Sequence, residues 1–407
     1  MTAYEAYSIT RPAITMADSD IGPDEIALVT EVLRSRALSF GPMIERFEIE
    51  WAARMGVAHA VAVSSGTAGL HLSMIAAGVD EDDLVITTPY SFVASANAIL
   101  YQRAVPVFVD IDPETLNIDP AQVAAALNDL AGDERDARRW LPRQGASAAR
   151  SARAVLPVHV FGRPAPMPPI VAASRAAGAA VVEDACEAIG ARHDGQAAGT
   201  FGDASVFGFF PNKQITMGEG GVIATDRADW AELFRSLRNQ GRDSDGAWLQ
   251  YSRLGYNYRL GDMNAALGLA QLRRLDDLLD RRARVAEAYS QRIAIDGVTP
   301  LAPAAGTVMS WFVYVVRLAP DIDRDLVMQR LTQRGIPSRP YFPSIHLQPF
   351  YRERFGYRDG DFPHAEAASR ATLALPFHAN LDRAAIDVVV AALEGAVVEA
   401  RGTRVTS

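Results

Sequence analysis

The chain has 407 residues, of which 49% are hydrophobic and 22% are charged, and its formal net charge is −9. This length predicts a large domain with a smaller one beside it, and the hydrophobic content excludes wholesale disorder. The negative charge argues against nucleic-acid binding, which needs a basic surface, although it leaves room for a local phosphate pocket.

Cysteine usage and hydropathy indicate the compartment. The single cysteine, Cys186, excludes an internal disulfide and suits a reducing cytosol. The first residues lack the basic and apolar regions of a signal peptide, and no apolar run approaches the roughly 20 residues that span a bilayer. We therefore expect a cytoplasmic protein without a membrane partner. The histidines lack metal-ligand spacing, so we expect no metal site.

Short apolar runs recur through the first two-thirds of the chain, and several are continuously apolar, as strands buried on both faces are. They are Ala60–Val63, Leu84–Thr87, Val105–Val109, Ala154–Val158, Ala179–Val182, Ala204–Phe207 and Val222–Ala224. Helical patterns lie between many of them, at Gly69–Ala77, Ser95–Tyr101, Pro120–Leu130 and Met167–Ala177. This alternation predicts an α/β fold with a mainly parallel sheet, whose ligands bind at the carboxyl ends of the strands.

One stretch stands apart from this rhythm. Residues 128–153 hold six arginines and four acidic residues without clear periodicity. The simpler interpretation is a solvated excursion between a helix and a strand. The alternative is a basic flap over an anionic substrate.

The last third predicts a linking helix and a smaller domain. An amphipathic pattern from about Asn264 to Ile293 joins a large domain (1–262, with the N-terminal segment) to a small α/β domain (296–407), with 263–295 as the link. We expect a strand at Phe312–Val316, a final helix at Ile386–Ala400, and an ordered proline-aromatic loop over 335–351.

Two residues at predicted strand ends carry chemistry. Lys213 follows an apolar run and precedes the Gly218-Glu219-Gly220-Gly221 turn, and Asp184 ends Val181-Val182-Glu183-Asp184. A loop lysine is usually only a solvated charge. Here, however, it can attack a carbonyl, and the carboxylate can hold a pyridinium nitrogen. Together they indicate pyridoxal 5'-phosphate (PLP).

Three further positions each have a purely structural interpretation. The Ser64–Gly69 turn opens a helix, so its free amides can hold a phosphate, although a simple N-cap explains it equally well. Phe92 fits either the core or a ring stacked on a flat cofactor. Asn257 fits a turn.

The order of these motifs resembles the DegT/DnrJ/EryC1/StrS family of PLP-dependent sugar aminotransferases, over nearly the whole chain. The matching segments are Ser39–Pro42, Ser65–Ala68, Pro89–Ala94, Asp110–Asp112, His159–Gly162, Glu183–Glu187, Asn212-Lys213, Gly218–Gly221, Gly255–Arg259 and Leu375–His378. The resemblance implies PLP fold type I, like aspartate aminotransferase, and a homodimer whose active sites lie at the subunit interface.

The resemblance also implies roles for the matching residues. Lys213 would form the internal aldimine and then shuttle a proton, and Asp184 would pair with the pyridinium nitrogen. Gly66 and Thr67 would hold the phosphate, Phe92 would stack on the ring, and Asn257 would reach the cofactor of the other subunit.

Lysine at 213 points to a transaminase, because a related dehydratase branch has histidine there. The resemblance implies that L-glutamate supplies the amino group and that a keto group on a nucleotide-linked deoxysugar receives it. A ketocyclitol acceptor, or an inactive scaffold that keeps the fold, remains an alternative. The sequence leaves open the nucleotide, the sugar, C3 or C4 amination, and surface-glycan or secondary-metabolite biosynthesis.

Two positions depart from the family pattern. Glu187 stands where glutamine or histidine often donates a hydrogen bond to the cofactor's ring oxygen, and an ionised carboxylate cannot donate. We therefore expect Glu187 to be protonated, turned toward a cation, or bridged by water. Gly208 stands where many relatives have a phosphate-binding serine.

The proline-aromatic segment supplies the expected substrate residues. It resembles the family region that closes over the sugar nucleotide, and Arg339 suits a diphosphate. Tyr341 and His346 are the other candidates, with core or interface packing as the alternative for both.

Overall fold

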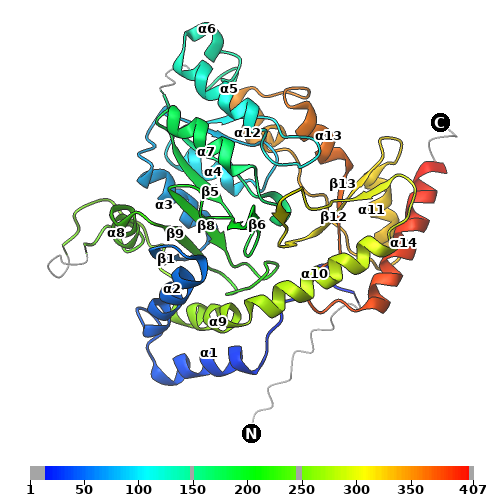
Figure 1. Cartoon of the computed structure of the whole chain (residues 1–407), viewed down its shortest axis with the longest axis horizontal. Helices are drawn as coiled ribbons and strands as arrows, with labels where there is room; N and C mark the ends of the chain where they lie inside the picture. Colours follow the sequence, from blue (N-terminus) through cyan, green and yellow to red (C-terminus); the bar gives the residue numbers. More distant parts are fainter. Residues whose placement is uncertain (1–13, 147–150, 244–249, 403–407) are drawn as a thin grey trace.

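The structure, a computed structural model, describes residues 14–146, 151–243 and 250–402 (Figure 1). Its centre is a seven-stranded sheet in the order β1-β9-β8-β5-β4-β2-β3. The strands are β1 (His59–Val63), β2 (Leu84–Thr87), β3 (Val105–Phe108), β4 (Ala152–Leu156), β5 (Ala180–Asp184), β8 (Ala204–Gly208) and β9 (Gly221–Thr225). Only β9 runs antiparallel to its neighbours, β1 and β8, so the predicted mainly parallel sheet is confirmed.

Both faces of this sheet are buried, which explains the continuous apolar runs. Along β1, Ala60 and Ala62 join one core cluster, whereas Val61 and Val63 join the cluster on the opposite face. The helices around the sheet are α1 (Pro23–Ser35), α2 (Pro42–Met55), α3 (Gly66–Ala76), α4 (Ala94–Tyr101), α5 (Pro120–Ala131), α6 (Glu134–Ala137), α7 (Met167–Ala176), α8 (Ala228–Leu237) and α9 (Asp262–Arg273). α2 and α9 cover one face at the β1 edge, and α3 and α8 cover the other.

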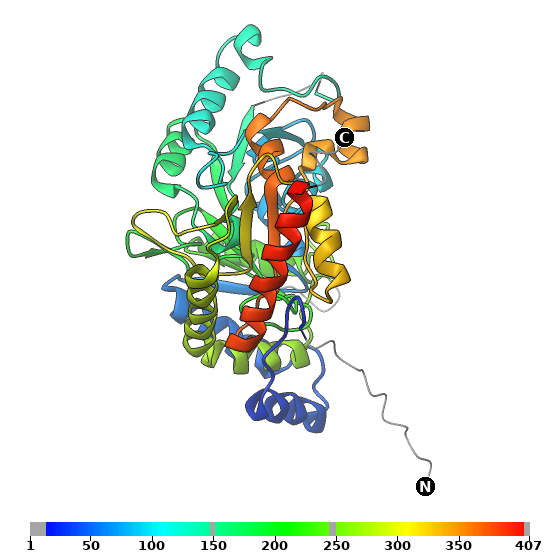
Figure 2. The ribbon, with the colours of Figure 1, turned by 90° about the vertical axis from the view of Figure 1, so that its right-hand side faces the viewer.

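The C-terminal part builds a second, smaller core. Strands β10 (Val298–Pro300), β12 (Tyr314–Leu318) and β13 (Thr372–Leu375) form an antiparallel sheet in the order β10-β12-β13. α11 (Arg324–Gln333) and α14 (Arg383–Gly402) lie side by side over this sheet (Figure 2). The remaining elements are β6 (Arg192–His193), β7 (Gln196–Ala197), β11 (Thr307–Val308), α12 (Pro349–Phe355), α13 (Pro363–Ala371), and the 3₁₀ turns η1 (Val160–Gly162) and η2 (Ile345–Leu347).

The predicted single linking helix is wrong in one respect. The pattern from Asn264 to Ile293 forms two helices, α9 and α10 (Leu275–Arg292), which meet at Arg274. Arg274 donates hydrogen bonds to Asp20 and Glu25, which draws the junction onto the N-terminal segment. α9 then packs on α1 and α2, whereas the end of α10 packs on α14. The proposed boundaries at 262 and 295 stay a prediction.

The arginine-rich stretch forms more contacts than a solvated excursion requires. Arg139 and Trp140 donate hydrogen bonds to Asp129, and Arg143 pairs with Asp361. Figure 1 shows α6 at the outer edge of the molecule, away from the centre of the sheet. Residues 147–150 lie outside the described residues. The described part of the stretch is therefore held against α5 and against Asp361, while its role in substrate binding stays a prediction.

Within the described ranges, no helix is long and apolar enough to cross a membrane. The same residues contain no group of three or more histidine, cysteine, aspartate or glutamate side chains arranged to hold a metal ion.

The buried carboxylate of Glu183 fixes the end of β5 through hydrogen bonds. Glu183 is fully buried, and its Oε1 accepts hydrogen bonds from the backbone N–H groups of Phe201 (2.7 Å) and Gly202 (2.8 Å). Its Oε2 accepts from Gly199 N–H (2.8 Å) and lies 3.0 Å from His159 Nε2. Because His159 Nδ1 accepts the Ala165 N–H (2.9 Å), the ring proton resides on Nε2 and is donated to Glu183.

Glu183→Gln should destabilise the protein by about 3–5 kcal/mol, because an amide nitrogen would face donors that the carboxylate now accepts. Urea denaturation measures the change. Glu50→Gln is the matched control, since the Glu50–Arg273 pair is exposed and its loss should cost under about 1 kcal/mol. Equal effects of the two substitutions would contradict the anchoring role of Glu183.

Candidate active site

Asp184 ends β5 immediately after the anchored Glu183, so its position at the sheet's carboxyl edge is fixed. Its side chain is buried, with Oδ2 accepting from Ser95 Oγ (2.7 Å) and Oδ1 from the Cys186 N–H (3.1 Å). No basic side chain of the described residues forms an ion pair with it. A buried carboxylate is stabilised by a cation, so this position suits a protonated ring nitrogen of a ligand.

Lys213 lies on the loop that follows β8. Its Nζ is 3.8 Å from Glu187 Oε1 and 3.9 Å from the centre of the Phe312 ring. The side chain is 14% exposed, so the amine is reachable but enclosed. Of the chain's 40 basic residues, Lys213 is the only lysine and the other 39 are arginines.

The surroundings of Glu187 bear on the three states that its sequence position left open. Burial raises the pKa of Glu187 to about 7, although the Lys213 charge and a hydrogen bond from the Phe161 N–H lower it. Near neutral pH this carboxyl group is therefore partly protonated, and it is turned toward a cation. Two of the three states expected from the sequence, a protonated carboxyl group and one turned toward a cation, are thus compatible with the same arrangement.

A cradle of small residues opens beside these groups. Ser65 caps α3 by accepting the Ala68 N–H. The other amides at the start of the helix have no intrahelical partner. A Cβ added to Gly66 would lie 2.7 Å from Cys186 Sγ, and one added to Gly221 would lie 2.5 Å from the Ser65 carbonyl carbon. These positions accept only glycine without rearrangement, and the helix start fits a phosphate.

Gly208, which stands where many relatives have a serine, lies beside the side chain of Cys186. A Cβ at Gly208 would lie 3.4 Å from Cys186 Sγ, so the sulfur occupies the space next to it. Gly208 brings no hydroxyl to the cradle, and Thr67, on the first turn of α3, is one of the expected donors, with Ser64 and Asn257.

Phe92 and Asn257 both lie on the surface of the single chain. Phe92 is 61% exposed and lines a groove of about 800 Å³ with residues of the 342–354 segment, including Phe342 and Tyr351. Asn257 is exposed between Tyr256 and Tyr258, whose rings stack at 5.1 Å. Both side chains are therefore free to meet a ligand or a second subunit.

The structure separates the three expected substrate residues. Burial raises the pKa of Tyr341 to about 12, and the Tyr341 ring lies 6.3 Å, centre to centre, from the ring of Phe312, which covers Lys213. Arg339 is exposed nearby and forms no ion pair with a described residue. His346 is fully buried against Phe362 and lies 3.2 Å from Glu366, so the core interpretation holds for it.

Two residues of the site were not predicted from the sequence. Ser95 holds Asp184, and Phe312 covers Lys213. Ser95 lies one turn after Phe92, at a helix start, which is the available sequence signal. No local pattern indicates Phe312, which the sequence placed inside a strand that begins only at Tyr314. The uniqueness of Lys213 was visible in the composition.

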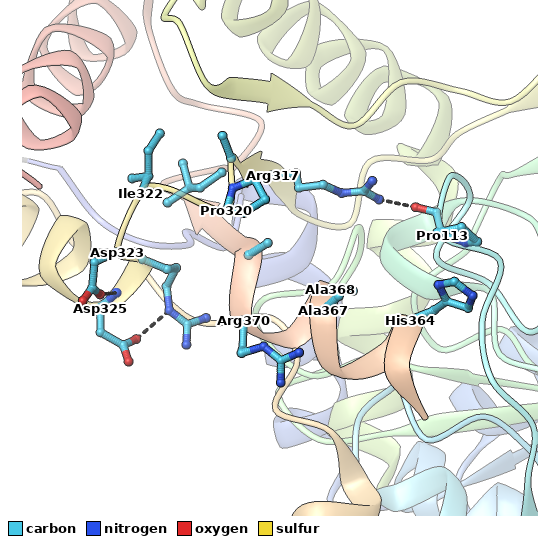
Figure 3. A pocket seen from close by; sticks show the side chains of 14 residues that line it. Pro113, Arg317, Pro320, Ile322, Asp323, Asp325, His364, Ala367, Ala368 and Arg370 are labelled. Atoms are coloured by element: carbon cyan, nitrogen blue, oxygen red, sulfur yellow. Dashed lines mark hydrogen bonds and ion pairs between the residues drawn. The ribbon is translucent and has the colours of Figure 1, made fainter. Parts of the chain in front are cut away.

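Another cavity, of about 520 Å³, lies away from these groups, between the Pro113 loop and α13 (Figure 3). Its lining includes three arginines, but Arg317 donates to the Pro113 carbonyl, Arg324 binds Asp325, and Arg370 pairs with Glu366. Two of the three arginine charges are therefore paired, and the cavity is lined by none of Lys213, Asp184 and Glu187.

The fold and the site define a PLP-dependent aminotransferase of fold type I, in which the cofactor supplies a ring that stabilises negative charge on the reacting carbon. The residues fit that group in three ways. Lys213 supplies an amine at the sheet edge, Asp184 is a buried carboxylate without a cation among the described residues, and the start of α3 is lined by glycine. The DegT/DnrJ/EryC1/StrS aminotransferase family matches residues 19–394, and the chain belongs to it. The resemblance and the PLP prediction are confirmed.

Named relatives give the context. GDP-perosamine synthase of Caulobacter vibrioides is 37% identical over 393 residues, covering 95% of this chain and 99% of the relative. The structure of aminotransferase TlmJ from Streptoalloteichus hindustanus is 32% identical, with a TM-score of 0.83 and coverage of 95% and 99%. DesI, solved in the presence of its TDP-sugar product, is 31% identical, with a TM-score of 0.83 and coverage of 97% and 95%.

Gly66→Ala should weaken PLP binding about tenfold or more, because the added methyl group meets Cys186 Sγ and displaces the cradle. Adding Cys186→Ala should restore part of the affinity, since it removes the colliding sulfur. Absorbance titration with PLP measures each dissociation constant against the Cys186→Ala background. Gly132→Ala, where the nearest atom is 3.4 Å away, is the control. Additive effects of the two substitutions would contradict the proposed contact.

Proposed function

We propose that this sugar aminotransferase moves the amino group of L-glutamate to a keto group of a nucleotide-linked deoxysugar in two half-reactions. The main support for this proposal is Lys213, the only lysine of the chain. Its amine is enclosed between Glu187 and Phe312 at the sheet edge beside Asp184. Similarity to GDP-perosamine synthase and to DesI, crystallised with a TDP-sugar, supports the substrate class.

In this proposal the residues divide the work. Lys213 holds the cofactor and then moves a proton at the amino-bearing carbon. Asp184 keeps the ring nitrogen protonated, because a buried carboxylate favours a nearby cation. Gly66 and Thr67 bind the phosphate through backbone amides and a hydroxyl, and Phe92 stacks on the ring.

The same proposal includes a cytoplasmic homodimer in which Asn257 reaches the partner's cofactor. Its exposed side chain in the single chain supports this role. A place in surface-polysaccharide biosynthesis, such as O-antigen formation, is supported by similarity to the spore coat polysaccharide biosynthesis protein SpsC of Bacillus subtilis, 36% identical over 393 residues.

Two rivals remain to be separated from this function. One is the same chemistry on a ketocyclitol or another non-nucleotide ketone. The other is an inactive scaffold, which has no physical need of a buried carboxylate without a cation next to an enclosed amine.

Excess L-glutamate should convert the visible absorbance band of the PLP-loaded protein to the near-ultraviolet band of the pyridoxamine form. Lys213→Ala should abolish this conversion, because no side-chain amine remains to move the proton. Supplying GDP-, UDP- and dTDP-linked keto sugars should then restore the visible band, whereas scyllo-inosose should not. A protein indifferent to glutamate supports the scaffold, and restoration by scyllo-inosose supports the cyclitol enzyme.

Arg339→Gln should raise the KM for the nucleotide sugar about tenfold or more and leave the glutamate half-reaction unchanged, because a guanidinium matches diphosphate oxygens. Steady-state kinetics with each substrate varied in turn measures the effect. Arg352→Gln is the control, since Arg352 already pairs with Asp359 on the surface. An effect confined to the glutamate half-reaction would exclude the diphosphate role.

A further inference from the structure

Glu187 lies where its own segment meets two others, at Phe161 and at the Lys213 loop. Its Oε2 accepts the Phe161 N–H (2.8 Å), and its Oε1 faces Lys213 Nζ at 3.8 Å. Its backbone carbonyl accepts a hydrogen bond from Gln214 Nε2 (2.6 Å), which belongs to the residue after Lys213. These contacts fix the carboxyl group on one side and couple it to the lysine loop on the other.

Phe312 closes the opposite side of the amine, and a second buried cation holds it there. Arg282 of α10 donates from Nε to the Trp311 carbonyl (2.9 Å) and from Nη2 to the Phe312 carbonyl (2.7 Å). Lys213 therefore has little freedom to turn away from Glu187. A movement of about 1 Å would bring Nζ and Oε1 to hydrogen-bond distance.

We propose that Glu187 is the proton partner of Lys213: it takes a proton from the ammonium group to free the amine, and it returns that proton afterward. Glu187 acts through Lys213 and is therefore a positioning residue. The inference depends on aminotransferase chemistry and not on which sugar is aminated.

The exchange balances without another reactant. The N–H bond of the Lys213 ammonium breaks, its electron pair stays on Nζ, and the proton binds Glu187 Oε1. An ionised pair thereby becomes a neutral amine and a neutral acid. Burial favours the neutral pair, whereas the carboxylate and the Phe312 ring favour the ammonium.

Other titratable groups face the pair. Asp184 raises the pKa of Glu187, and burial raises that of Cys186 well above its ordinary value, so the thiol stays neutral. Tyr341 also stays neutral near pH 7, because its pKa is raised to about 12. Glu187 is thus the group beside Lys213 whose charge changes in this range.

The test uses the single lysine. Acetylation of Lys213 is followed by mass spectrometry as a function of pH in the full-length chain, first free of cofactor and then with pyridoxamine phosphate bound. In wild type the rate should rise with pH, flatten near pH 7 as Glu187 ionises and holds the amine proton, and rise again. In Glu187→Gln this shoulder should vanish, because no carboxyl group remains to exchange the proton.

Two variants separate charge from structure. Glu187→Asp keeps a carboxyl group and should retain a smaller shoulder, whereas Tyr341→Phe should keep the full one. Identical profiles of wild type and Glu187→Gln, or no shoulder in cofactor-free wild type, would overturn the proposal. If circular dichroism shows that Glu187→Gln does not fold, the wild-type profile alone decides whether the proposal holds. Because acetylation needs no substrate, failure of the glutamate or sugar reactions leaves this result unaffected.

Discussion

The burial of the Glu183 carboxylate is the constraint on which the site depends. Three backbone N–H groups from residues 199–202 and the His159 ring converge on one fully buried side chain. Together they fix the end of β5 relative to the loops beside it. Asp184 and the turn to Glu187 begin at that point, so their direction is set by a neighbour that is itself fully buried. Preorganisation here comes from hydrogen bonds behind the site.

The site also depends on buried charges that are only partly compensated. Among the described residues, Asp184 has a serine hydroxyl and a backbone amide but no cation, and Arg282 has two carbonyls but no carboxylate. Burial lowers the pKa of Arg282 to about 10, which shows the cost of enclosing its charge. Such groups are expensive for folding, and a ligand or a proton transfer can use them.

Two parts of the chain meet at the reacting amine. The large sheet supplies Lys213, Asp184 and Glu187 from the ends of its strands. The C-terminal part supplies Phe312, held by Arg282 of the linking helix, and Tyr341 from the proline-aromatic segment. The environment of the amine therefore depends on how the second core is seated, although its chemistry resides on the first.

The sequence by itself determined the buried strands and the residues at their ends. Parallel strands covered on both faces must be apolar throughout, and their carboxyl edge is where Lys213 and Asp184 had to meet. Tertiary structure alone decided that Glu187 faces Lys213, that Phe312 covers the amine, that His346 joins the core, and that the linking helix breaks at Arg274. These outcomes follow from contacts between residues distant in sequence, and no local periodicity encodes such contacts.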